Sequence, residues 1–372
     1  MYRPLFFLLA FALYATGIWA VAETDWSPGP VATTVAARAA APVAPVAAPR
    51  PAPSPAPTLA DTVRPAVWTP SNLRDYLVAE LNRTNPSVAL GDLDRITLKS
   101  PYVAGFCHPI AHDLGHAALA KYDGDFAKAV SYRNDVCGSG YLHGVVEDKL
   151  AESPDPETEV TTLCSPDQTA SCVHGIGHGA MFVADLDVPK AEQLCDRFPR
   201  TYELVACSEG VFMQLFEPDV TDPRAMAQLR PAHFAGDPFY PCPAQPAVFQ
   251  SACYYYAPSY FLQQHDYAAH PGAFVQALDW CRQAPSAGQA SCTMGAGSRI
   301  MKYNIARPVW TAAQCEQAQP WQRPICMAGV VSYWDVNYHD DSAASKLCPQ
   351  LSGEARDECR AAAGSGSSGS ED

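Results

Sequence analysis

The sequence predicts an all-α protein, built from disulfide-stapled helical hairpins that repeat to form a solenoid-like or toroidal stack. Fourteen cysteines occur among 372 residues, and four successive pairs are each eleven residues apart. A histidine motif also recurs with a period of 31 residues, which is typical of stacked repeat units. Period-two runs of β-branched residues, the mark of strands, are nearly absent, so helices are favoured.

The N-terminal part of the chain predicts export. Residues 1–22 combine Arg3 with an apolar run and a final A-x-A motif, as in a signal peptide, with an uncleaved anchor as the alternative. Residues 23–66 are almost all Ala, Pro, Val, Thr and Ser and predict a tether. The expected location is therefore secreted, periplasmic or in the cell envelope, where disulfides persist.

The charge of the chain limits its partners. A formal net charge of −14 and a pI near 5.1 disfavour nucleic acid and anionic lipid, both of which select basic surfaces. We therefore expect no nucleic acid partner, and membrane association only through an uncleaved N-terminal anchor. The substrate or protein ligand stays unknown at this stage.

The folded part is expected to span residues 67–362. A first helix is predicted from Ser71, as N-cap, to Leu81, because apolar residues follow at three- and four-residue steps. Pro109 is expected as the first residue of a later helix, since proline is favoured there. Residues 363–372 are rich in Gly and Ser and predict a disordered tail.

The cysteines define the repeat. We expect a helix to end near the first cysteine of each pair and another to begin near the second. A glycine three residues after several of the second cysteines is expected to allow close helix approach. Each disulfide is expected to stabilise the fold by about 2–4 kcal/mol in the chain-entropy model. The predicted pairs are Cys164/Cys172, Cys195/Cys207, Cys242/Cys253, Cys281/Cys292, Cys315/Cys326 and Cys348/Cys359, with Cys107/Cys137 as the remaining pair.

Three successive units carry metal-ligand residue types at equivalent places. If the second cysteine of a unit is position zero, with Ile110 and Tyr141 taking that place in the two earliest units, positions two and six share one helix face. In the first three units these positions hold, in order, His112 with His116, His143 with Glu147, and His174 with His178. The later units keep the cysteines but not the histidines, so the fold itself does not require them.

The six residues predict a metal site, because divalent first-row metals select imidazole and carboxylate ligands. For any single pair, a hydrogen-bonded core histidine is the more ordinary interpretation. His108 precedes Pro109 and is expected to be a cap or supporting group off the repeated face. The remaining histidines lack a partner at helical spacing and are expected to be structural: His233, His265, His270 and His339.

One or two ions are expected, with iron or zinc as the first candidates and copper as the alternative. Packed helices lie about 8–10 Å apart, so a flat row of three would separate the outer two by about 16–20 Å. That separation is too wide for six side chains to reach one ion. A curved stack would bring the outer helices closer, and two ions with Glu147 as a bridging carboxylate would span the distance. Glu209, at position two of the fourth unit, is the candidate catalytic residue as a general base.

Two resemblances accompany the site. The run His112-Asp-Leu-Gly-His116 resembles the metal-binding motif of HD-domain phosphohydrolases, but the repeat aligns Asp113 with glycines, so that aspartate is read as incidental. The presence of His and Glu on adjacent helical repeats resembles the site of deoxyhypusine hydroxylase, a helical-repeat protein that holds two irons between such repeats. Its His-Glu dipeptides are absent here, so the resemblance is one of site construction and assigns no family.

The sequence therefore predicts an exported metal-binding repeat protein. An oxygenase or hydroxylase suits a nitrogen-rich dinuclear site, and a metal-assisted hydrolase is close behind. The alternative is a non-catalytic scaffold that presents a concave surface to a protein or cell-envelope partner. The aromatic run Tyr254–Phe261 is expected in a hairpin core, with a groove wall as the alternative.

Overall fold

The computed structural model describes residues 67–165, 169–218, 236–337 and 342–366, and every statement below concerns these residues. They contain helices and no strand, so the all-α prediction is confirmed. They fall within one compact unit of the chain. The predicted signal peptide and tether, His233 and His339 lie outside the described residues. No helix among the described residues is long and apolar enough to span a membrane.

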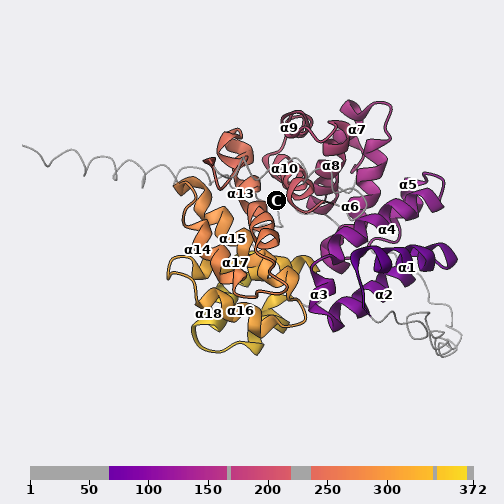
Figure 1. The fold of residues 1–372 in the computed structure, drawn as a ribbon. Coiled ribbons are helices and arrows are strands. Elements are labelled where there is room, and N and C mark those ends of the chain that lie inside the picture. The colour runs from indigo at the N-terminus through magenta and orange to yellow at the C-terminus, as the bar shows by residue number, and fades with distance from the viewer. Residues whose placement is uncertain (1–66, 166–168, 219–235, 338–341, 367–372) are drawn as a thin grey trace, which may run out of the picture. The chain divides into compact units, whose positions relative to one another are not determined.

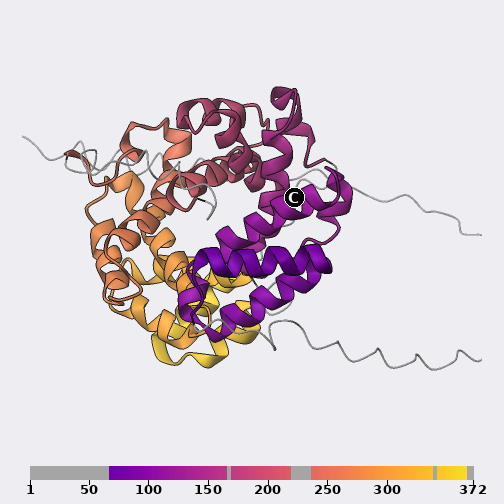
Figure 2. The same ribbon diagram turned by 45° about the vertical axis from the view of Figure 1, so that its right-hand side comes forward.

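Seven longer helices pack each against the next along the chain (Figures 1 and 2). Helix α17 also contacts α6, which brings the last of these helices against the second. The repeated helical hairpins are thus confirmed, whereas the curvature that distinguishes a solenoid from a toroid stays a prediction. The seven are α4 (Cys107–Lys121), α6 (Val136–Ala151), α8 (Ala170–Val183), α10 (Thr201–Phe216), α13 (Ala247–Gln264), α15 (Ser286–Tyr303) and α17 (Arg323–Asn337).

Shorter helices connect or flank these seven. Those that follow the long helices in the repeat are α5 (Phe126–Val130), α7 (Pro156–Thr162), α9 (Val188–Cys195), η2 (Cys242–Ala244), α14 (Ala273–Cys281) and α16 (Pro308–Glu316). The remaining elements lie at the two ends of the described chain: α1 (Pro70–Arg83), α2 (Pro86–Lys99), α3 (Pro101–Ala104), η3 (Ala343–Leu347), η4 (Cys348–Gln350) and α18 (Gly353–Gly366). Helix α18 extends into the segment predicted as a disordered tail.

All seven predicted disulfides are present, and no described cysteine is free. Five of them join a short helix or turn to the long helix that follows, and Cys348–Cys359 joins η4 to α18. The bond Cys107–Cys137 differs, because it joins the beginnings of two long helices, α4 and α6. Fourteen oxidised cysteines indicate an oxidising, extracellular type of environment.

Two helix starts differ from the sequence prediction. Helix α1 begins at Pro70 with Thr69 as N-cap, not Ser71, because Thr69 and Asn72 bind each other's backbone N–H groups in a capping box. Helix α4 begins at Cys107, two residues before Pro109. Pro109 still lies in the first turn, where its missing N–H has no helical partner to lose.

Glycines bring the long helices into backbone contact. A Cβ added to Gly144 on α6 would collide with the carbonyl oxygen of His112 on α4, and one added to Gly177 on α8 with the carbonyl oxygen of Cys207 on α10. Only glycine permits such an approach, as the sequence predicts for the position-three glycines, of which Gly144 is one. The approach draws the position-two and position-six side chains of neighbouring helices together.

Candidate metal centre

Four buried histidine side chains converge at the meeting point of α4, α6 and α8. One ligand nitrogen from each lies within 4.8 Å of one from every other: His108, His112, His143 and His178. We call these four residues the histidine cluster. The ring centroids of His112 and His178, from the first and third units, are only 4.5 Å apart. The helices thus approach more closely than a flat row would allow, and the four histidines form a group that could hold a metal ion.

Fixed acceptors set the protonation of three rings. The Nδ1–H of His108 donates to the Cys137 carbonyl oxygen at 2.5 Å, and that of His112 donates to Glu147 Oε2 at 3.0 Å. The Nδ1–H of His178 donates to Gln214 Oε1 at 2.7 Å. Since a neutral imidazole carries one proton, the Nε2 atom of each ring keeps its lone pair. Histidines that bind metals show this arrangement, with the second nitrogen bound to a carboxylate, carbonyl or amide.

The lone pairs point at one another. Nε2 of His108 lies 3.0 Å from Nε2 of His112 and 3.4 Å from Nδ1 of His143. Two lone pairs at these distances repel unless a proton or a cation lies between them. Metal–imidazole bonds of about 2.0–2.1 Å put neighbouring ligand nitrogens about 3.3 Å apart in a tetrahedral site. These two distances are close to that value, and all four ligand nitrogens lie within 4.8 Å of one another, so the group could hold a metal ion.

His143 supplies the fourth nitrogen from the middle helix. Its Nε2 lies 3.1 Å from Ser171 Oγ, a hydroxyl that can accept the Nε2–H, and in that tautomer Nδ1 faces the cluster with its lone pair. Burial lowers the pKa of His108, His143 and His174 well below the usual histidine value, because the charged form is poorly solvated there. Neighbouring rings and Lys302 act in the same direction. These imidazoles are accordingly neutral and able to bind a metal near neutral pH.

Glu147 holds the outer side of the cluster. It is 1% exposed, and its carboxylate contacts His112 Nδ1 and, at 3.1 Å, His116 Nε2. Burial raises the pKa of Glu147, but the adjacent His116 and His112 outweigh it and lower the pKa to about 2. The carboxylate meets the nitrogen of His112 that faces away from His108. In this geometry Glu147 contacts two imidazoles, those of His112 and His116.

The six sequence-predicted residues thus divide into two groups. His112, His143 and His178 join the cluster through their ring nitrogens. His116 and Glu147 form the carboxylate–imidazole layer beside it, and His174 lies against His143, with ring centroids 4.6 Å apart and its Nε2 3.2 Å from Met213 Sδ. The structure thus brings three of the six residues into one group, and the other three lie beside it.

His108 is where the sequence prediction was wrong. It was expected off the repeated face, yet it lies one turn before His112 on α4, and its Nε2 reaches both His112 and His143. The error came from starting α4 at Pro109, which left His108 outside the helix. The available signal was the four-residue step from His108 to His112, the same step that links His112 to His116.

A strained segment places the acceptor for His108. Cys137, Gly138 and Ser139 have φ of 57°, 66° and 61°, a left-handed conformation that costs about 1 kcal/mol or more for the two non-glycine residues. The disulfide to Cys107 and a hydrogen bond from Gly138 N to Asn337 Oδ1 at 3.1 Å hold this segment. It turns the Cys137 carbonyl toward the cluster.

A cavity of about 490 Å³ opens beside the cluster and is lined by His108, His143 and His174. Glu209, the predicted catalytic residue, also lines it and is half-buried. Burial raises the pKa of Glu209 to about 7, against an opposing effect of Arg299. A carboxyl group with this pKa can accept or donate a proton near neutral pH.

Aromatic and basic side chains form another part of the wall. Tyr255 and Tyr256 line the cavity, whereas Tyr254 is buried in the core, so the aromatic run serves both predicted purposes. The guanidinium of Arg299 lies 4.2 Å from the Tyr256 ring centroid. Lys302 also lines the cavity.

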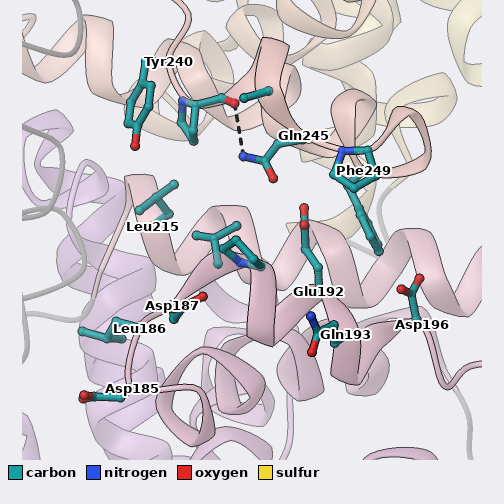
Figure 3. A pocket seen from close by; sticks show the side chains of 15 residues that line it. Asp185, Leu186, Asp187, Glu192, Gln193, Asp196, Leu215, Tyr240, Gln245 and Phe249 are labelled. Atoms are coloured by element: carbon teal, nitrogen blue, oxygen red, sulfur yellow. Dashed lines mark hydrogen bonds between the residues drawn. The ribbon is translucent and has the colours of Figure 1, made fainter.

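A second cavity, of about 890 Å³, lies between α9 and the segment that leads into α13 (Figure 3). It is lined by Asp185, Asp187, Glu192 and Asp196 and contains no histidine. Glu192 is 3% exposed, and burial together with Asp196 raises its pKa to about 7. Its four acidic groups are not brought together as a metal-binding group, so the histidine-lined cavity is the stronger site.

The two other described histidines lie away from the cluster. His265 is exposed and stacks on Phe261, with ring centroids 3.9 Å apart, and His270 is also exposed. Comparison with known proteins gives no relative: no protein-family model, curated protein or solved structure matches the chain. The chemistry of the site therefore rests on its own geometry.

Proposed function

We propose that this protein binds one first-row divalent ion, iron or zinc, through Nε2 of His108, His112 and His178 and Nδ1 of His143. The observation that carries the proposal is the convergence of ring nitrogens whose protons are held elsewhere. An ordinary core histidine is satisfied by one hydrogen bond and needs no second histidine beside it. Here two Nε2 atoms, each left with a lone pair, lie 3.0 Å apart in a buried site.

We further propose that the bound ion serves an enzyme of oxygenase or hydroxylase type. The ion would act as a Lewis acid beside the cavity, and a six-coordinate ion such as iron keeps positions open in addition to four imidazoles. A four-coordinate zinc would be closed by the same set, as in structural sites. Glu209 supplies a proton-transferring group in the cavity wall, and Tyr255 and Tyr256 shape the space for a substrate.

The disulfides support an exported protein. We propose that residues 1–22 direct export and that the helical part folds in the periplasm, the cell envelope or outside the cell. Seven disulfides among the described residues require an oxidising compartment to form and persist. Mass spectrometry of the protein from its native cells tests this: a mature N-terminus at Glu23 supports cleavage, and an intact Met1 in a cytoplasmic fraction contradicts export.

The metal proposal is tested by elemental analysis of the untagged protein and of single variants. We expect close to one ion per native chain, and a loss of at least tenfold in affinity in His108→Ala and His143→Ala. His265→Ala is the matched control, because His265 is exposed and outside the cluster. Metal-free native protein under metal-replete conditions, or equal metal content in His108→Ala and His265→Ala, would refute the site.

A further inference from the structure

Two buried cations share one carboxylate on the wall of the histidine-lined cavity. Arg299 and Lys302, one turn apart on α15, are each 2% exposed and both line the cavity. Arg299 Nε donates to Glu217 Oε1 at 2.8 Å, and Lys302 Nζ donates to Glu217 Oε2. Buried charges are normally paired, because an unpaired one loses its hydration without compensation. One carboxylate balances only one of these cations.

The groups facing the pair leave a surplus of positive charge below about pH 7, because burial raises the pKa of Glu209, the nearest further acid, to about 7. Burial also lowers the pKa of Lys302, against the opposing effect of Glu217, which holds the ammonium charged. Among the residues that line the cavity, Glu209 is the one carboxylic acid.

The rings of Tyr255 and Tyr256 lie over the guanidinium, and the hydroxyls of Ser259 and Ser298 accept hydrogen bonds from it. Burial raises the pKa of both tyrosines, so they are neutral. The neutral histidines on the other side add no negative charge.

The lining is suited to an organic anion. The volume of about 490 Å³ falls in the range of small-molecule sites and is much larger than an inorganic ion needs. The Tyr256 ring lies between the two ends of the site, 6.1 Å from the His174 ring and 4.2 Å from Arg299 Cζ, measured to its centroid. The Ser251 and Ser291 hydroxyls, 3.0 Å apart, add hydrogen-bonding groups to the wall.

From this surplus charge we infer that the substrate is a small organic molecule with an anionic group, a carboxylate or a phosphate. Arg299 and Lys302 hold the anionic group, and the rest of the molecule lies along Tyr256 toward the histidine cluster. The inference deepens the proposed function and rests on it for the reacting end of the molecule. The anion-binding end stands on Arg299, Lys302 and Glu217 alone.

The test is a calorimetric titration of the full protein, with and without its metal, using benzoate, phenyl phosphate and the uncharged benzamide. We expect at least one of the two anions to bind at least tenfold more tightly than benzamide, and the comparison of the two identifies the anionic group. Equal binding of all three, or no binding of either anion, overturns the inference. Because this comparison uses the native chain, it does not depend on any variant folding.

A variant that lacks one of the two cations tests whether Arg299 and Lys302 bind the anion. Lys302→Met leaves Glu217 with one cation, so the fold should persist by circular dichroism and anion affinity should fall at least tenfold. Arg282→Met removes an exposed cation on the loop before α15 and should change nothing. Unchanged anion affinity in folded Lys302→Met protein contradicts the inference. Anion binding that persists in a protein found to bind no metal sinks the proposed function while leaving the anion site intact.

Discussion

The imidazoles of His112 and His178 meet with ring centroids 4.5 Å apart, although they are 66 positions apart in the sequence and one long helix of the repeat lies between theirs. The intervening helix, α6, packs against both α4 and α8. The two rings therefore contact each other directly, alongside α6. His143 of α6 lies next to them, with its ring centroid 5.6 Å from that of His112. A single ion can then contact three successive units of the repeat.

Replacing Gly177 with Ala should push α8 away from α10, which carries Gln214, the acceptor for His178. The new methyl group would collide with the Cys207 carbonyl on α10, which cannot move without shifting its helix. We expect a loss of about 1–3 kcal/mol in the free energy of unfolding, together with weaker metal binding. Gly91→Ala on α2 is the matched control, since nothing lies within 4 Å of its added Cβ, and it should be neutral or stabilising by up to about 1 kcal/mol.

Urea unfolding and metal titration measure both effects. If Gly177→Ala is as stable as the native protein and binds metal equally well, the helix contact does not control the site.

Replacing Glu147 with Gln should weaken metal binding about 10–100-fold, because the charged acceptor that orients His112 is lost. The metal-free protein should also become less stable. Since the pKa of Glu147 falls to about 2 from 4.5 on folding, its contribution is complete above pH 4.5 and is lost as the pH falls toward 2. The full difference is at most about 3 kcal/mol.

Chemical unfolding between pH 2 and pH 7 checks this window, and Glu152→Gln, exposed at the end of the same helix, is the control. A difference between native and Glu147→Gln protein that grows as the pH falls would contradict the assignment.

Replacing Glu209 with Gln should stabilise the protein at alkaline pH. The pKa of Glu209 is raised from 4.5 to about 7, so its ionisation disfavours the folded state as the pH rises through this range. The variant lacks the ionisation and should be more stable by about 1–3 kcal/mol at pH 8, with no difference below pH 4.5. The lower end of this range allows for solvent screening, since the Glu209 side chain is partly exposed.

The control is Glu316→Gln, an exposed glutamate. Equal unfolding midpoints for native and Glu209→Gln protein at pH 8 would show that Glu209 is fully solvated. Its role as a proton-transferring group would then lose its support.

The sequence alone determined the helical class, all seven disulfide pairs and the three helices that carry the site. These features depend on local rules: a short loop between two cysteines, a helical step of three or four residues, and a fixed repeat. His112 and His116 must share a helix face whatever surrounds them. The pairing of Cys281 with Cys292 likewise needs only one helical hairpin.

Only the tertiary structure decided which nitrogen atoms converge. The cluster contains His108 instead of His116, and Glu147 contacts His112 on the side away from His108. Both features depend on how closely α4, α6 and α8 approach and how they are rotated. Glycine contacts such as that of Gly144 with His112 set the approach, and the left-handed segment at Cys137 turns a carbonyl toward His108. The sequence period records that residues are equivalent along the repeat, but the distance between two side chains is fixed by the packing of their helices.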